Sequence, residues 1–552
     1  MTAADRAALI EVRGLEVMPR EHPSRRILKG VDFEVRAGEC LAVIGESGAG
    51  KSLALKAVCG LLPPCLRAAG SVRLEGREVL DLGYRRSDRG RRLLYLSQQP
   101  MSAFEPLSRL GGQLIETLRT HEPGLSQREA RRRIEETLAR LRFENPAEAL
   151  DKYPSELSGG MLQRAMTAVA VLLRPQIVVA DEPTSALDVL SVREVLRELM
   201  GIRRETGAPL VVVTHDLAFA RRIADRCIVF KSGEIVESGP MKDFERARHP
   251  YVRRLAAMQG VLEKGLARAL AARPDSEAGA APGDAPQPEE NSGSRAPALI
   301  EVERLAKSYP VRGARSLRAL LAPRARRQVL RGASFSIAPG EAVGLVGASG
   351  EGKSTLARIL LGLEKPDSGE VRLPPGAATG RLAAMSLVSQ NYVDSADPSW
   401  NVARILAEPL EIARVQGRAA HAVDAAFLAR RLAEAGLPAE KLQARPYELS
   451  GGELQRVCIA RALIHRPRFV VFDEALSSLD ASVQGEMIEL LKSLRSPETA
   501  WLFISHDLKA VAALCSRVLF LKDGRIIESL AVEQLSRART EPVRALIDAA
   551  RG

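Results

Sequence analysis

Aromatic residues are scarce in this 552-residue chain, at 4% of its positions, whereas hydrophobic residues of all kinds make up 46%. The interior must therefore be filled largely by aliphatic side chains. Cysteine is also rare, and no two of the six lie in a CxxC pair or beside a histidine cluster. This spacing disfavours a metal site or a disulfide framework and favours reduced, mostly buried thiols in a cytosolic protein. The six are Cys40, Cys59, Cys65, Cys227, Cys458 and Cys515.

Long apolar runs are missing as well. None approaches the roughly 18 residues that a membrane-spanning helix needs. The first residues, Met1–Arg13, do not show the basic-then-apolar pattern of a secretory signal. We therefore expect any membrane role to come through a separate partner protein.

The net charge of +12 raises the question of nucleic-acid binding. The arginines are spread through many segments, however, and no RNA-binding aromatic motif accompanies them. We therefore expect no nucleic-acid partner. Solvated helical faces explain the charge most simply, and attraction to an anionic membrane surface is the functional alternative.

What the chain does contain is an internal repeat, which predicts two similar domains at about 8–262 and 298–540. Residues 263–297 between them are predicted to form a flexible linker, because Asp275–Pro297 is rich in Ala, Pro, Gly, Glu and Ser. Matching segments outside the motifs are Leu9–Val12 with Leu299–Val302, Ile27–Gly30 with Val329–Gly332, and Arg226–Gly233 with Arg517–Gly524.

Each copy contains short apolar runs that indicate buried parallel strands. They are Cys40–Ile44, Ile177–Ala180 and Leu210–Val213 in the first copy, and Ala342–Val346, Phe469–Phe472 and Trp501–Ile504 in the second. Polar residues follow the end of each run. Because open α/β sheets bind ligands at the carboxyl ends of their strands, these residues are predicted to share a site.

The first such polar segment in each copy is a GxxxxGKS motif. Its glycines allow the backbone to wrap around a phosphate chain, whose charge is stabilised by the N–H groups and the following helix N-terminus. The lysines are predicted to reach the β- and γ-phosphates, and the final serines to supply an oxygen to Mg²⁺. The motifs are Gly45, Glu46, Ser47, Gly48, Ala49, Gly50, Lys51 and Ser52, and Gly347, Ala348, Ser349, Gly350, Glu351, Gly352, Lys353 and Ser354.

Three further residue types recur in the same order. An isolated aspartate at a strand end is usually a cap or turn residue, but the neighbouring glutamate and the motif upstream favour Asp181 and Asp473 as Mg²⁺ ligands, through water. Glu182 and Glu474 are predicted to be the general bases, or to polarise the attacking water. His215 and His506 are predicted to contact the γ-phosphate. Gln98 and Gln390 are predicted to contact Mg²⁺ or the attacking water; Gln99 leaves a one-residue ambiguity that the repeat resolves toward Gln98.

A Leu-Ser-Gly-Gly segment precedes a predicted helix in each copy. Small residues at a helix start expose N–H donors and the positive end of the helix dipole, which together form a second phosphate site. Because the glycine-rich loop already surrounds the phosphates from one side, this site is predicted to serve an ATP held by the other copy. The residues are Ser158, Gly159 and Gly160, and Ser450, Gly451 and Gly452.

With these motifs the chain resembles the ATP-binding cassette (ABC) ATPases over nearly all of both halves. The resemblance implies an α/β fold of two tandem P-loop ATPase domains, each with a mainly parallel core sheet, an antiparallel β subdomain and a helical signature subdomain. It also implies ATP and Mg²⁺ as cofactors and head-to-tail pairing of the two cassettes within the chain. Ser185–Asp188 and Ser478–Asp480 are similar to the family's D-loops, which cross the dimer seam.

The family often stacks adenine on an aromatic residue after the first strand. Tyr309 fits that role in the second copy, with a plain strand-edge tyrosine as the alternative. The aligned residue in the first copy is Pro19, with no aromatic residue nearby, which places adenine affinity there in doubt.

A narrower resemblance points to importers. Met161–Arg164, Ala180–Thr184 and His249–Val252 resemble the first ATPase of peptide/nickel importers, and Glu453–Arg461 and Phe472–Asp480 the second. Neither copy has the cysteine-rich extension of many peptide-type members, which leans toward nickel or metal-chelate uptake rather than di- or oligopeptides. The resemblance implies two transmembrane permease subunits, an extracytoplasmic solute-binding protein and a peripheral location on the cytoplasmic membrane face.

Two other functions are alternatives. A soluble twin-cassette protein acting on ribosomes or nucleic acid would usually carry zinc cysteines, an iron–sulfur cysteine set or a long charged helical linker, none of which is present. In a sugar-type twin cassette the second copy often has eroded motifs, whereas both sets here are intact. The arginine-rich stretch Arg312–Arg327 is either a solvated insertion or a contact for acidic lipid or a partner.

Overall fold

The computed structural model describes residues 8–46, 48–80, 89–98, 100–141, 143–183, 189–271, 298–310, 326–348, 350–373, 385–415, 423–477, 479 and 481–551. The chain divides into two compact units, one formed mainly by Met1–Gln259 and the other mainly by residues 260–552. Each unit contains one six-stranded sheet and one smaller antiparallel sheet.

The core sheet of the first unit has the strand order β10-β9-β3-β8-β7-β6. Neighbouring strands from β9 to β6 run parallel, and only β10 at the edge is antiparallel. The parallel strands are short and almost wholly apolar, as expected for strands covered on both faces. Their bounds are β3 Cys40–Gly45, β6 Leu93–Leu96, β7 Ile177–Asp181, β8 Leu210–Val213, β9 Arg226–Lys231 and β10 Glu234–Pro240.

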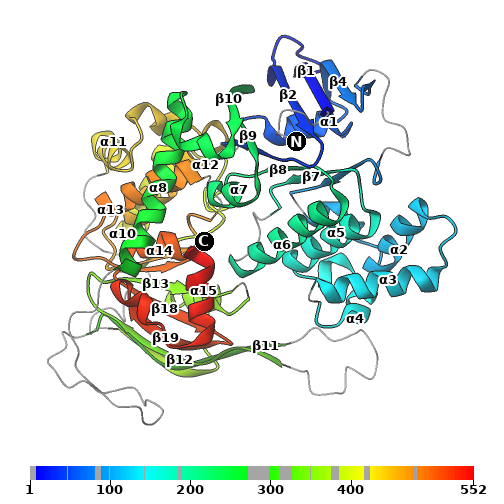
Figure 1. Ribbon diagram of the computed structural model, residues 1–552. Helices are drawn as coiled ribbons and strands as arrows, with labels where there is room; N and C mark the ends of the chain where they lie inside the picture. The colour runs from blue at the N-terminus through cyan, green and yellow to red at the C-terminus, as the bar shows by residue number, and fades with distance from the viewer. Residues whose placement is uncertain are drawn as a thin grey trace. The chain divides into compact units, whose positions relative to one another are not determined.

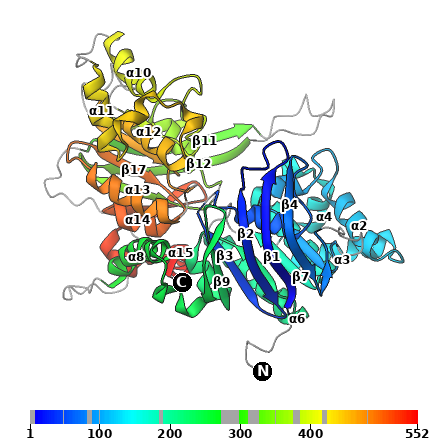
Figure 2. The ribbon, with the colours of Figure 1, turned by 90° about the horizontal axis from the view of Figure 1, so that it is seen from above.

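An antiparallel sheet with the order β2-β1-β4-β5 completes the β structure of this unit. Figure 2 shows β1, β2 and β4 side by side as a layer of long strands. One apolar cluster joins this sheet to the core sheet and to helix α1, which follows β3. The bounds are β1 Ala8–Pro19, β2 Leu28–Arg36, β4 Leu66–Leu74, β5 Arg77–Glu78 and α1 Lys51–Val58.

Helices α2, α3 and α4 pack with α5 as a separate helical layer, seen at the right of Figure 1. Their contacts form an aliphatic cluster that extends to α6 and to the neighbouring face of the core sheet. The helices of the unit are α2 Leu110–His121, α3 Gln127–Arg140, α4 Pro146–Asp151, α5 Gly159–Leu173, α6 Val189–Thr206 and α7 Leu217–Ile223. Helix α8 Pro250–Ala271 follows, and its residues from Gly260 onward belong to the second unit.

The second unit repeats this architecture with the sheet orders β15-β16-β17-β13-β18-β19 and β12-β11-β14. Its strands are β11 Ile300–Pro310, β12 Arg326–Ile337, β13 Ala342–Val346, β14 Ser368–Arg372, β15 Met385–Val388, β16 Phe469–Asp473, β17 Ala500–Ile504, β18 Arg517–Lys522 and β19 Arg525–Ala531. Its helices are α9 Lys353–Leu360, α10 Val402–Val415, α11 Ala425–Glu434, α12 Gly451–Leu463, α13 Ala481–Ser493, α14 Leu508–Leu514 and α15 Glu541–Arg551. The predicted α/β fold class with two similar domains is confirmed.

The structure differs from the sequence prediction at the start of the linker. Residues 263–271 form the last turns of α8 instead of flexible chain. Leu262, Leu266 and Ala269, which belong to the second unit, lie at helical spacing and pack into the apolar cluster that contains Trp501. Burial of this apolar face stabilises the helix. Residues 272–297 lie outside the described part of the chain, and the other domain limits stay predictions.

Candidate active sites

The glycine-rich loop of the first unit joins the buried strand β3 to helix α1, which begins at Lys51. Gly50 caps the helix in the left-handed region, with φ 102°, and a Cβ atom there would lie 2.6 Å from Leu28 Cδ2. At Gly45 a Cβ atom would lie 2.4 Å from the carbonyl oxygen of Phe230. Both positions therefore require glycine, because the loop is pressed against its neighbours.

The lysine of each loop is folded back over the backbone. Lys51 Nζ donates to the carbonyl oxygens of Gly45 and Glu46 at 2.7 and 2.8 Å, and its residue is only 4% exposed. Lys353 Nζ makes the same pair of bonds to Gly347 and Ala348, at 2.8 and 2.9 Å. A buried cation beside a helix N-terminus suits a chain of phosphates.

The serine that follows each lysine is bonded to the aspartate at the end of a core strand. Ser52 Oγ donates to Asp181 Oδ1 at 2.8 Å, and Ser354 Oγ donates to Asp473 Oδ1 at 3.2 Å. Burial raises the pKa of both aspartates, opposed by these hydrogen bonds. Hydroxyl and carboxylate oxygens are the ligands that Mg²⁺ prefers, so the residues present fit a magnesium ion.

The glutamate after each aspartate is held by the predicted glutamine. Gln98 Nε2 donates to Glu182 Oε2 at 2.7 Å, and Gln390 Nε2 donates to Glu474 Oε2 at 3.1 Å. Both glutamates have positive φ angles, 45° and 49°, which is uncommon outside glycine. Such strained positions cluster at functional sites.

The two histidines lie close to these carboxylates. His215 Nδ1 is 3.7 Å from Glu182 Oε2, and His506 Nδ1 is 3.9 Å from Glu474 Oε2. Burial raises the pKa of Glu182, but the hydrogen bonds and charges of His215, Lys51 and Gln98 outweigh it and leave the pKa below its usual value. Glu182 therefore stays ionised at neutral pH although it is largely buried.

The two Leu-Ser-Gly-Gly segments cap helices, as predicted. Ser158 Oγ accepts the N–H of Met161 at the start of α5, and Ser450 Oγ accepts the N–H of Glu453 at the start of α12. Only the second helix has a capping box, because Glu453 Oε2 also accepts the N–H of Ser450. Each segment exposes a helix N-terminus within its own unit. The predicted pairing of each segment with the other half's glycine-rich loop stays a prediction.

The residue predicted to stack on adenine in the second copy, Tyr309, is held by polar contacts. Tyr309 Oη donates to Glu364 at 2.7 Å, and Lys307 Nζ lies 5.6 Å from the ring centroid. In the first unit Pro19 ends β1, and the neighbouring Arg20 Nε donates to the carbonyl oxygen of Pro64. The stacking role of Tyr309 stays a prediction.

Sequence reasoning missed two tyrosines that contact these sites. Tyr95 Oη donates to Asp181 Oδ2 at 2.5 Å, and Tyr251 Oη accepts the N–H of Glu46 in the glycine-rich loop at 3.1 Å. Tyr251 lies within the importer-like segment His249–Val252, which by itself indicates no contact with the loop. A comparison of the two copies would have flagged Tyr95, since the second copy has Leu387 at the matching place.

Several predicted residues lie outside the part of the chain that the structure describes. They are Ser47 and Ser349 of the loops, Gln99, the stretch 184–188, Ser478, Asp480 and residues 311–325 of the arginine-rich insertion. At the described end of that insertion, Arg326 pairs with Asp367 at 3.3 Å.

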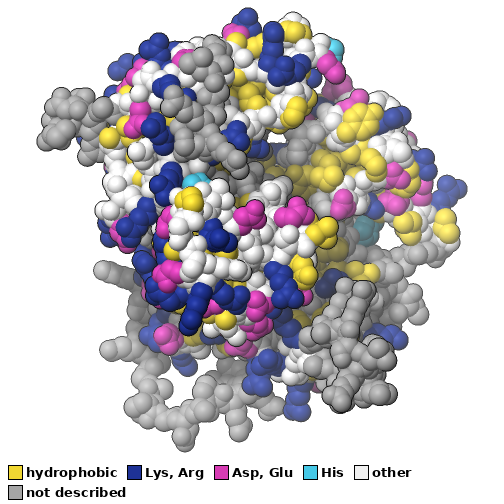
Figure 3. All heavy atoms as spheres, turned by 90° about the vertical axis from the view of Figure 1, so that its right-hand side faces the viewer, with side chains coloured by type: hydrophobic (Ala, Val, Ile, Leu, Met, Phe, Trp, Pro, Cys, Tyr) yellow, Lys and Arg dark blue, Asp and Glu magenta, His cyan; other side chains and the backbone are white. Residues whose placement is uncertain are grey.

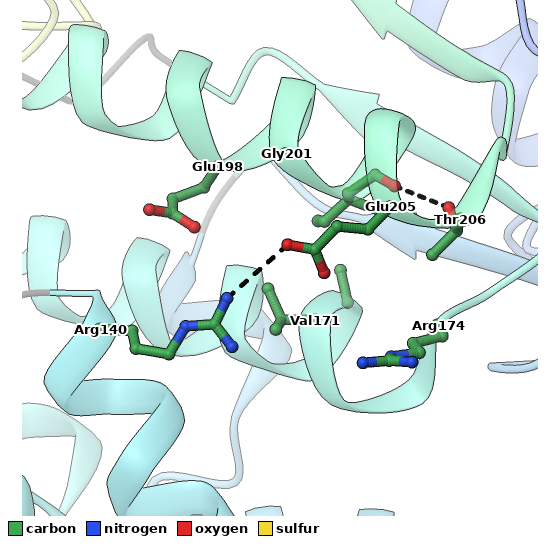
Figure 4. Close-up of a pocket in the computed structure, with 9 residues that line it drawn as sticks. Arg140, Val171, Arg174, Glu198, Gly201, Glu205 and Thr206 are labelled. Atoms are coloured by element: carbon green, nitrogen blue, oxygen red, sulfur yellow. Dashed lines mark hydrogen bonds and ion pairs between the residues drawn. The ribbon is translucent and has the colours of Figure 1, made fainter.

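A small, open surface pocket lies in the first unit between the end of α3, α5 and α6. Figure 4 shows Arg140 pointing toward Glu205, and the two charges are 3.8 Å apart. The other charged residues in its lining are Arg174 and Glu198. None of the predicted site residues lines this pocket, so it is separate from the candidate active sites.

The chain matches the model of the ABC transporter family twice, over residues 28–185 and 330–477. These ranges include both glycine-rich loops, both Leu-Ser-Gly-Gly segments and both Asp-Glu pairs. The chain belongs to the ABC transporter family. It carries two cassettes, and it is an ABC-type ATPase. Among the described helices none is long and apolar enough to cross a membrane.

Curated relatives of this ABC protein match nearly its whole length. It is 34% identical over 532 residues to the glutathione import ATP-binding protein GsiA of Escherichia coli strain K12, covering 91% of this chain and 82% of GsiA. It is 34% identical to the uncharacterized ABC transporter ATP-binding protein YejF of the same strain, covering 94% and 95%. It is 32% identical to the peptidoglycan transport ATP-binding protein YejF of Agrobacterium fabrum, covering 98% and 96%.

Solved structures with the same twin-cassette fold are more distant. The RNase-L Inhibitor aligns with a TM-score of 0.57 at 20% identity, covering 91% of this chain and 88% of that one. An archaeal ribosome recycling factor, aABCE1, solved with the stalk protein aP1, aligns with a TM-score of 0.56 at 20% identity and the same coverage. These likenesses show the fold alone.

Proposed function

We propose that both cassettes hydrolyse ATP with Mg²⁺ and that the energy drives an importer of small peptides. The observation that carries the ATPase part is the duplicated contact set. In both units the loop lysine donates to loop carbonyls, the serine donates to the aspartate, and the glutamine donates to the glutamate. The matching hydrogen-bond distances in the two units differ by 0.4 Å or less. A set retained twice supports catalytic competence in both cassettes.

Each site residue then has a defined role. Lys51 and Lys353 bind the β- and γ-phosphates, together with the N–H groups of their loops. Ser52 and Ser354 would hold the magnesium ion directly, with Asp181, Asp473, Gln98 and Gln390 around it. Magnesium supplies neutralisation of the charge that develops on the phosphates during transfer.

Glu182 and Glu474 orient the attacking water and accept its proton. Gln98 and Gln390 hold these carboxylates in place through their amide N–H groups. His215 and His506 are placed to contact the γ-phosphate. Hydrolysis at each site is completed by the helix start at Ser158–Gly160 or Ser450–Gly452 of the other cassette, which we propose closes over the nucleotide.

The import part of the proposal is supported by the relatives. One relative that is 34% identical over 91% of this chain is named for glutathione import, and glutathione is a tripeptide. We therefore propose small peptides as the transported class, with nickel or metal chelates as the competing outcome. The partners would be two permease subunits and an extracytoplasmic solute-binding protein, and the chain would act at the cytoplasmic membrane face.

The charge distribution supports this function over the nucleic-acid alternative. Figure 3 shows lysine and arginine side chains scattered among acidic ones over the visible face, with no single basic patch in its coloured part. The twin-cassette likeness to a ribosome recycling factor is at 20% identity and carries only the fold.

Reconstitution would test the proposed function. The chain would be purified with its neighbouring permeases, inserted into vesicles, and supplied with ATP and the solute-binding protein. We expect uptake of glutathione or another short peptide, abolished by Lys51→Ala together with Lys353→Ala. Uptake of nickel or a nickel chelate alone would overturn the peptide assignment. Co-purification with ribosomes in place of permeases would overturn the importer assignment.

A further inference from the structure

The two aspartates at the proposed magnesium sites are not held in the same way. Asp181 is 1% exposed, and each of its carboxylate oxygens accepts one hydroxyl, from Ser52 at 2.8 Å and from Tyr95 at 2.5 Å. At Asp473, the only side-chain hydrogen bond within the described residues comes from Ser354, at 3.2 Å. One hydroxyl group therefore distinguishes the first site from the second.

The difference traces to a single position of the repeat. Tyr95 on β6 pairs with Val179, two residues before Asp181. Leu387 on β15 pairs with Val471, two residues before Asp473. The strand registers are the same, so the side chain at this position lies on the same face of the sheet as the aspartate in both units. Leu387 is 39% exposed, which leaves space for a larger side chain there.

The Tyr95 hydroxyl is a hydrogen-bond donor to Asp181, and the carboxylate accepts this bond through Oδ2. A carboxylate torsion is broad and two-fold when only one oxygen is held. Because each oxygen can accept two hydrogen bonds, bonds from Ser52 and Tyr95 fix the plane and still leave acceptor positions open.

We propose that Tyr95 is a positioning residue for the magnesium site of the first cassette, and that it makes this site hold Mg·nucleotide more tightly than the second site does. The inference rests on the proposed role of Asp181 at the magnesium ion. Hydrogen-bond partners of metal-binding carboxylates typically change metal affinity by about 10–100-fold when they are removed. The two cassettes are then unequal in metal dependence although their phosphate-binding residues match.

The test is a binding measurement on the full-length chain. A fluorescent, non-hydrolysable ATP analogue is titrated with and without Mg²⁺, in a Lys353→Ala background that disables the second site. The dissociation constant without Mg²⁺, divided by the dissociation constant with Mg²⁺, measures how strongly magnesium supports nucleotide binding. We expect Tyr95→Phe to lower that ratio about 10-fold. The dissociation constant without magnesium should be unchanged, whereas a merely structural role would move both. Tyr153→Phe, in the same unit, is the matched control.

A reciprocal variant, which introduces a tyrosine at the matching position of the second unit, tests the proposal without changing Tyr95. In a Lys51→Ala background, Leu387→Tyr should raise the ratio at the second site, and it carries the test if Tyr95→Phe fails to fold. An unchanged ratio in the variant that folds, or equal changes with and without magnesium, would overturn the proposal. Asp181→Asn distinguishes failure of the Tyr95 inference from failure of the proposed magnesium role of Asp181. If it lowers the ratio and Tyr95→Phe does not, only the Tyr95 inference fails. If neither lowers it, the magnesium role of Asp181 fails as well.

Discussion

The imidazole Nδ1 of His215 lies 3.7 Å from Glu182 Oε2, and this proximity helps to keep a largely buried carboxylate ionised. The pair sits where two neighbouring core strands end, since Glu182 follows β7 and His215 comes shortly after β8. The same arrangement occurs between His506 and Glu474 at 3.9 Å. His215 is therefore placed to influence the protonation of the proposed base Glu182.

Replacing His215 should change the pH dependence of the first site. The pKa of Glu182 is depressed in the folded protein, so the carboxylate stays ionised until the pH falls through that low value. Without His215, burial dominates and raises the pKa. We expect His215→Ala, measured in a Glu474→Gln background, to move the acid limb of the kcat profile to higher pH. The exposed His22→Ala is the control, and an unmoved acid limb would contradict the assignment.

The free energy of unfolding of the first unit should also depend on pH through Glu182. A depressed folded-state pKa at Glu182 contributes stability above the unfolded-state value near 4.5, and this contribution is lost as the pH falls further. With His215→Ala, the free energy of unfolding of the first unit should therefore fall less between neutral and acid pH than it does in the unchanged protein. Urea unfolding at neutral and at acid pH would measure the difference, and an equal loss of stability at both would argue against the linkage.

Removing both proposed bases should arrest turnover and leave nucleotide binding intact. General-base groups typically contribute about 10²–10⁴-fold to the rate. We expect Glu182→Gln with Glu474→Gln to lower ATP hydrolysis by that order and to retain ATP after gel filtration. The exposed Glu144→Gln is the matched control. Near-normal hydrolysis by the double variant would overturn the assignment.

Thiol reactivity should single out one cysteine. Cys65 is exposed, whereas the other five are buried. Burial raises the pKa of Cys40 and Cys515 to about 12 and that of Cys227 and Cys458 to about 11, and it also raises the pKa of Cys59. Because the thiolate is the reactive form, a thiol reagent at neutral pH should label one group per native chain and six after unfolding. Cys65→Ser should abolish the native reaction; rapid labelling of a second thiol would contradict the burial.

The end of α8 should stabilise the second unit. Leu266 packs in the apolar cluster that contains Trp501, and deletion of a buried leucine side chain typically costs about 2–5 kcal/mol. We expect Leu266→Ala to lower the urea midpoint reported by Trp501 fluorescence in a Trp400→Phe background. The exposed Arg268→Ala serves as control. An unshifted midpoint would mean that residues 263–271 behave as linker after all.

The motifs that form the candidate active sites could be located from the chain alone because each is short and has strong local requirements. The glycines of the loop at Gly45–Gly50 are required by backbone geometry, and Asp181 is placed by the strand that it ends. The repeat then supplied a second example of each motif. For the same reason the α/β class was predictable, since each apolar run is short, buried and followed by polar residues.

Contacts between distant parts of the chain were decided only by the tertiary structure. Tyr95 and Asp181 are separated by 86 positions, and Glu46 and Tyr251 by 205, so no local pattern predicts that they meet. The sequence prediction began the linker at residue 263, yet Leu266 and Ala269 pack in the apolar cluster of the second unit, to which they belong. The sequence by itself determined which reactive groups exist and on which element each lies. Packing decided which of them touch, because burial energy depends on the whole fold and not on the neighbours along the chain.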